Sequence, residues 1–289
     1  MNVVTDVLLP AALAVIMLSL GLGLLPDDFR RVLARPRALA AGLAGQLLLV
    51  PLIGWAIAWG WNLPAEMAVG LMIVAACPGG ASSGLITHLA RGDTALSISL
   101  TAVSSIAAAA TLPLIVDLAL RHFLGATSAA EIPVLRLSRG VFFLTTVPVA
   151  LGMLVKRLRP AGTARILKGA ERLATGLFLA IVVATFVSQR GALADNIGSI
   201  GPAAAALNLT VMAAGFWLAA GLGLSRRDRI AISTECGLHN AAVGIYLAAT
   251  VLGAPRLAVP SVVYALLMNL SAIAFIVLMR RRAALCAAA

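Results

Sequence analysis

The chain is poor in charged residues, and this shortage limits what it can be. Only 11% of its 289 residues are Asp, Glu, Lys or Arg, whereas 61% are hydrophobic and the mean hydropathy is +1.02. A soluble domain carries about 25% charged and about 45–50% apolar residues. A soluble fold of this size has too little interior to bury such an excess of apolar surface. The sequence therefore predicts a polytopic membrane protein.

Cysteine and histidine are also scarce, which excludes several kinds of chemistry. The three cysteines form no CxxC pair, and the three histidines show no HExxH spacing. A disulfide framework, a zinc site and a metalloenzyme are therefore disfavoured. The net charge of +11 does not indicate a nucleic-acid partner, because the basic residues stand in short clusters between apolar runs. We expect no enzyme, no organic cofactor and no nucleic-acid binding.

Apolar runs long enough to cross a bilayer recur along the whole chain. A helical span needs about 20 apolar residues, and no barrel-like alternation is present. We predict an all-α polytopic membrane protein of about nine transmembrane helices, forming a single transporter unit over residues 1–289. The predicted spans are residues 4–25, 38–60, 66–90, 94–120, 139–157, 170–189, 197–224, 229–251 and 258–279.

The basic residues predict how these spans are oriented. If the N-terminus lies outside the cell, seventeen of the 22 Lys and Arg residues fall in cytoplasmic loops. This is the bias that the positive-inside rule describes. We therefore expect a multi-pass protein of the cell (inner) membrane, with its N-terminus outside and its C-terminus in the cytoplasm.

Two predicted spans contain residues that interrupt a helix. The span 66–90 contains "CPGG", where Pro78 lacks a backbone donor. The span 229–251 contains "TECGLHN", with Gly237 at its centre. Each is the third span of a four-span set, the first within about 4–120 and the second within about 139–279, which begins with an extra helix at 139–157. An odd offset of five spans makes the sets inverted repeats, and paired interruptions of this kind indicate a transporter site.

Glu235 is the one acidic residue that we place near a membrane midpoint. A carboxylate at that depth costs roughly 3 kcal/mol even on insertion scales, and no Lys or Arg lies at matching depth. A metal cation or a proton is therefore its expected partner. Sodium, as a hard ion, prefers oxygen ligands. Oxygen-bearing side chains at suitable depth are Gln46, Ser82, Ser83, Ser97, Thr101, Asn240 and Asn269.

Several of these stretches together resemble a known family. "CPGGASSGLITHLARGDTALSISLTAVSS" followed by "TECGLHNA" resembles the bile acid:sodium symporter family, in its bacterial form, and the likeness covers nearly the whole chain. The resemblance implies a core domain and a panel domain, with two discontinuous helices crossing in the core. It implies two sodium sites that share Glu235. The first would use Ser83, Ser97 and Thr101, the second Gln46 and the backbone carbonyls of Cys236, Leu238 and His239, and the substrate would meet Ser82, Asn240 and Asn269.

Two positions depart from the family pattern. Gly84 stands where the family usually has asparagine, which removes an amide oxygen from the first sodium site. His239 stands where the family has glutamine, and an imidazole facing the cavity could titrate near neutral pH. We therefore expect one or two sodium ions and leave proton coupling open.

The function predicted from these residues is secondary active transport by alternating access. The chain would import a small organic anion (bile-acid-like, keto-acid or pantothenate-like) together with sodium. The alternative is a proton-coupled or exporting relative, similar to arsenite exporters, that uses Glu235 and His239 and has Cys77 near its first interruption. Arg91 and Asp93 are expected to pair across a turn. For Tyr246 and Tyr264, both cavity-facing and packed positions stay open.

Overall fold

The chain folds as a bundle of helices. The computed structural model describes residues 8–24, 35–80, 82–125 and 134–288, and for residues 134–137 and 282–288 it describes the backbone alone. Within these ranges every regular element is helical, apart from one isolated antiparallel bridge between Gly79 and His239. The α-helices are α1 (Leu9–Gly23), α3 (Pro36–Ala44), α4 (Val50–Gly60), α5 (Ala65–Ala76), α6 (Ser83–Leu89), α7 (Thr94–Ala119), α9 (Val134–Val141), α10 (Val147–Leu158), α11 (Pro160–Ser188), α12 (Arg190–Gly221), α13 (Arg226–Gly237), α14 (Ala241–Tyr246) and α15 (Val259–Ala288).

Several of these helices continue through short segments of different pitch. Four π-helical segments lie at Gly45–Leu49, Leu120–Leu124, Phe142–Thr146 and Leu247–Val251, and a 3₁₀ turn at Pro255–Ala258 leads into α15.

Six helical stretches within the described ranges are long and apolar enough to cross a membrane, by length and composition. They are Pro36–Gly60, Thr94–Leu124, Ser138–Leu158, Pro160–Ser188, Arg190–Gly221 and Pro255–Arg281. Three shorter apolar helices, at Leu9–Gly23, Ala65–Ala76 and Ala241–Val251, fall within other predicted spans. These helices support the predicted multi-pass membrane protein, whereas the number of nine spans stays a prediction.

Two helices begin well before the spans predicted for them. α11 begins at Pro160 rather than near residue 170, and α12 begins at Arg190 rather than near residue 197. The first turns of α11 carry Arg, Lys, Ala and Leu, which are good helix formers but not all apolar. A prediction based on hydropathy detects only the apolar part of such a helix, so it places the beginning too late.

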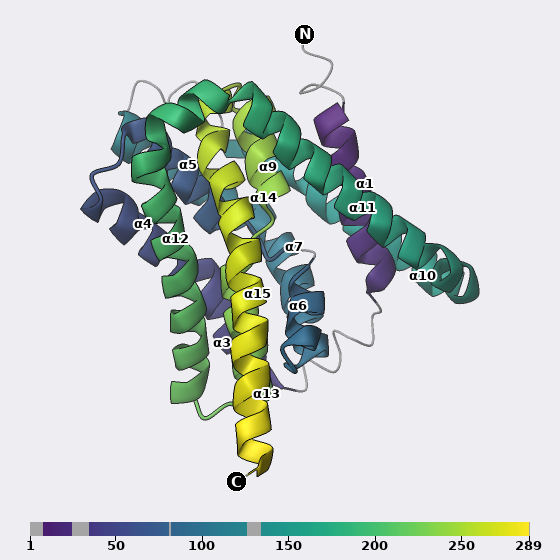
Figure 1. Cartoon of the computed structure of the whole chain (residues 1–289). Helices are drawn as coiled ribbons and strands as arrows, with labels where there is room; N and C mark the ends of the chain where they lie inside the picture. Colours follow the sequence, from purple (N-terminus) through teal and green to yellow (C-terminus); the bar gives the residue numbers. More distant parts are fainter. Residues whose placement is uncertain (1–7, 25–34, 81, 126–133, 289) are drawn as a thin grey trace.

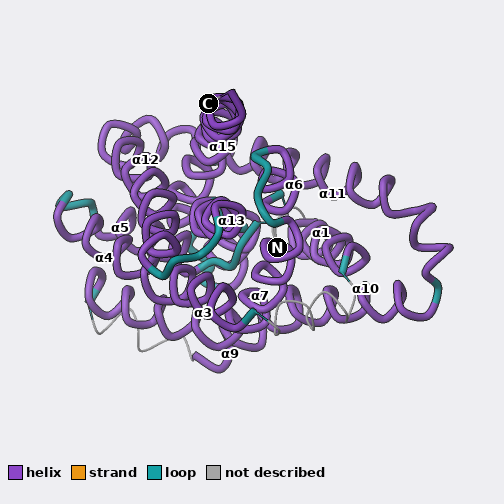
Figure 2. The backbone as a smooth tube through the Cα atoms, turned by 90° about the horizontal axis from the view of Figure 1, so that it is seen from below, coloured by secondary structure: helices purple, strands orange, loops and turns teal. Residues whose placement is uncertain are grey.

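Glycine allows α1 and α10 to pack closely. A Cβ atom on Gly21 would overlap the carbonyl oxygen of Val149, and one on Gly152 would overlap the carbonyl oxygen of Leu18. Small residues let helix backbones approach, which favours helix association in lipid. α11 packs on the same α1, and these three helices extend away from the rest of the bundle in Figure 2. Figure 1 shows α12 and α15 running side by side in the rest of the bundle.

Two helices are interrupted, and the two interruptions are hydrogen-bonded to each other. α5 ends at Ala76 before α6, and α13 ends at Gly237 before α14. The amide of Gly80 donates to the carbonyl of Leu238 (2.6 Å), and the amide of Asn240 donates to the carbonyl of Pro78 (2.8 Å). These bonds satisfy backbone groups that helix ends leave free. In lipid such groups have no water to pair with.

A three-residue charge cluster joins three segments at the beginnings of α3, α7 and α13. Arg35 donates to Asp93 (2.7 Å) and to both carboxylate oxygens of Asp228 (2.7 and 2.9 Å). Asp93 also accepts from the amide of Leu96 and so caps α7, whereas Asp228 is buried in the first turn of α13. Asp93 therefore forms its ion pair with Arg35, and not with Arg91 as expected. The backbone of Arg91 adopts a left-handed conformation (φ 62°) in the turn before α7.

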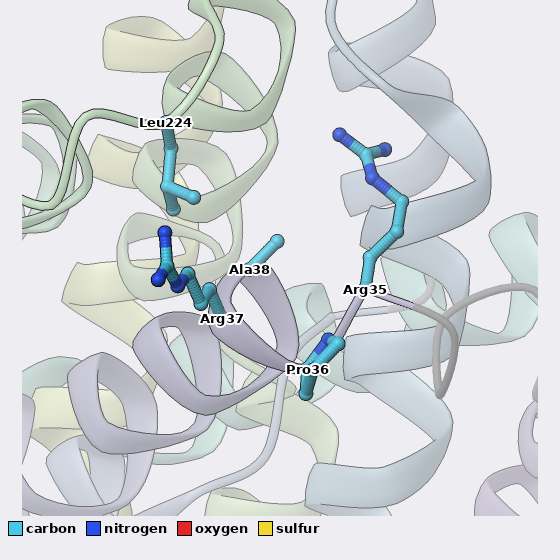
Figure 3. Close-up of a pocket in the computed structure, with 5 residues that line it drawn as sticks. All are labelled: Arg35, Pro36, Arg37, Ala38 and Leu224. Carbon is cyan, nitrogen blue, oxygen red and sulfur yellow. The ribbon is translucent and has the colours of Figure 1, made fainter.

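Arg35 keeps its charge in this cluster. Burial acts to lower the pKa of its guanidinium, but the carboxylates of Asp228 and Asp93 outweigh burial and hold that pKa above its ordinary value. A hollow of about 280 Å³ lies beside it, lined by Arg35, Pro36, Arg37, Ala38 and Leu224. In Figure 3 the side chain of Arg37 points toward Leu224, whereas the guanidinium of Arg35 extends away from both.

Replacing Arg35 is expected to lower thermal stability. Arg35→Gln removes the charged partner of the buried Asp228, and hydrogen bonds to charged groups contribute about 1.5–3 kcal/mol. Because Arg35 is half exposed, we expect a loss of roughly 1–2 kcal/mol, or roughly 2–6 °C in Tm. Thermal unfolding of the purified protein in detergent micelles measures this. Arg37→Gln is the matched control and should leave Tm unchanged, and equal Tm values for both variants would contradict the assigned role.

Candidate cation and substrate site

Glu235 lies fully buried in the last turn of α13, facing three hydroxyl groups. Thr101 donates to its Oε1 (2.8 Å) and Ser97 donates to its Oε2 (3.3 Å), both from α7. Ser83, at the beginning of α6, lies 3.0 Å from Thr101 Oγ1 and 3.3 Å from Ser97 Oγ. The structure thus brings together the four side chains expected at the first sodium site.

This cluster offers more oxygen atoms than protons. The three hydroxyls of Ser83, Ser97 and Thr101 supply three protons, and the hydroxyl of Thr101 is shared between Glu235 and the Ser97 carbonyl (3.1 Å). A buried carboxylate is costly without a compensating positive charge. A cation coordinated by these oxygens would supply that charge and replace the hydrogen bonds among them. A hard cation suits such a donor set.

Gly79 makes the approach of Glu235 to the first interruption possible. A Cβ atom on Gly79 would overlap the Oε1 of Glu235. Gly80 is less constrained, because its Cβ would lie 3.1 Å from the carbonyl oxygen of His239. The glycine pair therefore lets two interruptions and a carboxylate share one small volume.

Gln46 and His239 form a second polar cluster at the same interruption. The Nε2 of Gln46 donates to the carbonyl of Cys77 (2.9 Å) and lies 3.2 Å from the Nδ1 of His239, which is itself 3.2 Å from that carbonyl. Both side chains are buried. Among the described residues the Oε1 of Gln46 and the Nε2 of His239 have no hydrogen-bond partner. The unpaired amide oxygen is available as a cation ligand.

The backbone carbonyls expected at the second sodium site lie at the end of α13 and just beyond it. The carbonyl of Leu238 accepts from Gly80 and that of His239 accepts from Ala241 (3.0 Å), so each keeps one lone pair for a cation. The thiol of Cys236 points elsewhere, since it packs against Gly45 and Gly215. Only the carbonyl of Cys236 can therefore serve this site.

A cavity of about 530 Å³ opens beside both clusters. Its volume lies within the range of about 300–1,000 Å³ that small-molecule sites occupy. The three residues expected to meet the substrate, Ser82, Asn240 and Asn269, all line it, as do Gly84 and His239. Asn240 also caps α14 through its Oδ1, which accepts from Val243 (3.4 Å). α1 and α11 form one wall, and α6, α7, α14 and α15 contribute to the other.

The cavity includes polar residues that the sequence analysis did not assign to it. They come from α1, α6, α7 and α11, and they are Ser19, His88, Thr94, Glu171 and Thr175. Glu171, Ala174, Thr175 and Phe178 recur at i, i+3, i+4 and i+7, the spacing of one helix face. That periodicity in the printed sequence could have identified this wall of the cavity.

The thiol of Cys77 does not take part in the cavity. Cys77 is 1% exposed, and its sulfur packs near Gly244 on α14. Among the described residues that line the cavity, none is a cysteine. This placement gives no support to the alternative similar to arsenite exporters, in which the thiol of Cys77 would bind the substrate.

Sequence comparison places this geometry among transporters. A sequence model of the sodium bile acid symporter family matches residues 10–196. YocS of Bacillus subtilis (strain 168), an uncharacterized sodium-dependent transporter, is 31% identical over 259 residues, which cover 90% of this chain and 78% of the relative. A probable sodium/metabolite cotransporter of rice (Oryza sativa subsp. japonica), the chloroplastic BASS2, is 30% identical over 275 residues, which cover 95% of this chain and 64% of the relative.

A further relative carries a more specific name. The sodium-dependent organic anion transporter of mouse (Mus musculus) is 31% identical over 186 residues, which cover 64% of this chain and 49% of the relative. The chain thus spans less than two thirds of the length of both the rice and the mouse proteins.

Enlarging Gly79 is expected to weaken cation binding at Glu235. In Gly79→Ala the new methyl group displaces the carboxylate from Thr101 and Ser97, so the oxygen cluster no longer surrounds a common point. We expect the half-saturating sodium concentration for thermal stabilisation to rise at least tenfold, measured by titrating sodium against potassium at constant ionic strength. Gly60→Ala is the control, because its Cβ would meet nothing within 4 Å. An unchanged sodium titration of Gly79→Ala would contradict this reading of the site.

Proposed function

Because the chain belongs to the sodium bile acid symporter family, we propose that it is a sodium-coupled secondary active transporter of a small organic anion. It is a transporter rather than an enzyme, as the family and the relatives indicate. The observation that carries the proposal is the buried carboxylate of Glu235, surrounded by three hydroxyls at the point where two interrupted helices meet beside a cavity.

Sodium would bind at the two clusters that flank Glu235. The first ion would use Glu235 with Ser83, Ser97 and Thr101. A second ion would use Gln46, Glu235 and the free carbonyl lone pairs of Cys236, Leu238 and His239. Gly84 contributes no amide oxygen to the first site, so the second site would hold its ion more tightly. By linkage, an ion that orders the interruptions raises substrate affinity, and the substrate raises ion affinity by the same factor.

The cavity favours a substrate that carries both apolar and polar groups. Ile16, Leu20 and Phe178 supply apolar surface, whereas Asn240 and Asn269 supply amides at the sodium side. The name of the mouse relative, an organic anion transporter, supports an anion, whose negative group would lie near the bound sodium.

Glu171 suggests that the substrate also carries a hydrogen-bond donor. It is the one carboxylate among the described residues that line the cavity, and none of these residues is Lys or Arg. An apolar anion gains nothing from the exposed carboxylate of Glu171, whereas a hydroxyl or ammonium group on the substrate would donate to it. We therefore assign the substrate to carboxylates that carry a hydrogen-bond donor at their other end.

Transport would follow alternating access between two parts of the molecule. The group of α1, α10 and α11 would act as the panel, and the helices that contain and surround the interruptions would act as the core. The proposal retains nine spans, two inverted repeats over about 4–120 and 139–279, an external N-terminus and a cytoplasmic C-terminus. In such folds the ligand site stays with one part while the two parts rock against each other.

Proton coupling is the second candidate, and one observation favours it. His239 is one of the residues that line the cavity, and the Nε2 of its fully buried imidazole has no partner among the described residues. A proton carried there beside Glu235 would take the place of one sodium ion. Uptake driven by a pH gradient in the absence of sodium identifies this case.

Neutralising Glu235 tests the sodium proposal directly. Wild-type protein should be more stable in sodium than in potassium, because a ligand that binds only the folded state stabilises it in proportion to ln(1 + [L]/Kd). Glu235→Gln should lose this difference, and sodium-gradient-driven uptake into proteoliposomes should fall to background while membrane insertion is intact. Glu66→Gln, at the exposed pair with Arg256, is the control and should behave as wild type. Full sodium dependence in Glu235→Gln would refute the proposed site.

Glu171 can be tested with three probes that differ at one end. Octanoate, 8-hydroxyoctanoate and 8-aminooctanoate share a carboxylate and a chain length. In sodium, the hydroxyl and amino compounds should raise Tm more than octanoate does, and Glu171→Gln should remove the advantage of the amino compound. Arg172→Gln, next to Glu171 and outside the cavity lining, should preserve it. Equal shifts for all three probes in the wild type would contradict the assigned substrate class.

A further inference from the structure

The carbonyl oxygen of Gly237, the last residue of α13, receives hydrogen bonds from two other helices. Asn208 Nδ2 on α12 donates to it at 2.8 Å, and Tyr264 Oη on α15 donates to it at 2.9 Å. Asn208 Nδ2 also donates to the Tyr264 hydroxyl, at 3.1 Å. Both side chains are almost completely buried, at 1% and 0% exposure. The three groups form a closed triangle that holds one atom of the second interruption.

This triangle determines which carbonyls at the end of α13 remain open. The carbonyl of Thr234 accepts from Leu238 (2.9 Å), as expected in a last helical turn. The carbonyl of Gly237 has both lone pairs filled by Asn208 and Tyr264. A cation can therefore not recruit the Gly237 oxygen, but it can recruit carbonyls on either side.

Because the Gly237 carbonyl is held in place, the carbonyls of the two neighbouring residues are restricted as well. The peptide that joins Gly237 to Leu238 is planar, so its orientation restricts the directions in which the Cys236 and Leu238 carbonyls turn. α12 reinforces this hold at two further points. The hydroxyl of Ser233 donates to the Met212 carbonyl (2.7 Å), and a Cβ on Gly237 would overlap the side chain of Met212.

Tyr264 touches the site at a second place. Its ring lies 5.3 Å from the imidazole of His239, centroid to centroid, at an angle of 55°. One side chain thus contacts the residues before and after Leu238. Met268, one turn further along α15, lines the substrate cavity.

We propose that Asn208 and Tyr264 are positioning residues of the sodium site, which hold the Gly237 carbonyl away from the ion and direct the Cys236 and Leu238 carbonyls toward it. Neither side chain touches the ion. The inference rests on the sodium binding proposed above and extends it to two residues from helices outside the interruptions.

The test is a sodium titration of variants that each lose one donor. Tyr264→Phe removes only the hydroxyl, and Asn208→Leu replaces the amide by an apolar group of similar size. A typical hydrogen bond contributes about 1 kcal/mol net, so each variant should raise the half-saturating sodium concentration by up to about fivefold. The readout is Tm in detergent as sodium replaces potassium at constant ionic strength. The Tm in potassium alone is recorded beside it, because a purely structural role lowers Tm in both salts and leaves the half-saturating sodium concentration unchanged.

Tyr246→Phe is the matched control. Tyr246 and Tyr264 are the two tyrosines of the chain, and Tyr246 lies on α14, the other half of the same interrupted helix. It should titrate with sodium like the wild type. If Asn208→Leu does not fold, Tyr264→Phe decides the question alone.

Two outcomes overturn the inference in different ways. If Tyr264→Phe lowers Tm in potassium but keeps the wild-type half-saturating sodium concentration, the triangle is structural only, and the proposed function stands. If wild-type protein shows no stabilisation by sodium relative to potassium, the sodium proposal fails and the positioning role fails with it.

Discussion

A helix that breaks inside a bilayer leaves backbone donors and acceptors with no water to satisfy them, and most of this structure depends on how that demand is met. Each interrupted helix supplies hydrogen-bond partners for the other, through the bonds from Gly80 to Leu238 and from Asn240 to Pro78. The pairing requires glycine where the two backbones approach, and it brings the last turn of α13 against the hydroxyls of α6 and α7. Glu235 is buried there with those hydroxyls facing it.

Polar groups elsewhere in the chain also join helices to one another. Arg35, Asp93 and Asp228 form one cluster that ties three helix beginnings together, whereas Asn208 and Tyr264 converge on a single carbonyl. In an aqueous protein such groups would often be exposed and interchangeable. Here each has a named partner, and each partner lies on a helix distant in the sequence. Polar contacts therefore specify the packing of helices whose apolar faces alone would tolerate many arrangements.

The sequence reveals the site more readily than it reveals the supports around it. Glu235 and the nearby hydroxyls stand out because a polar residue in the middle of an apolar run is expected to lie near the middle of the membrane. Asn208 likewise stands in the middle of an apolar span, 197–224, but it is not among the predicted site residues. The Arg35 cluster could not be foreseen, since its members are separated by 58 and 193 positions and follow no local pattern. Glu171 lies at the beginning of the predicted span 170–189, where a carboxylate is ordinary, so only its helix-face spacing with Ala174, Thr175 and Phe178 could have marked it.

The pairing of the interruptions has a consequence for how the protein is made. Gly79 and His239 form the bridge between them, yet about 160 residues separate the two along the chain. At synthesis rates of about 5–20 residues per second, the first interruption waits roughly 8–30 s before its partner exists. During that interval its free amides and carbonyls have no native acceptor or donor in the lipid. We therefore expect the first half of the chain to stay near the aqueous insertion machinery, or to bind a temporary partner, until α13 and α14 arrive.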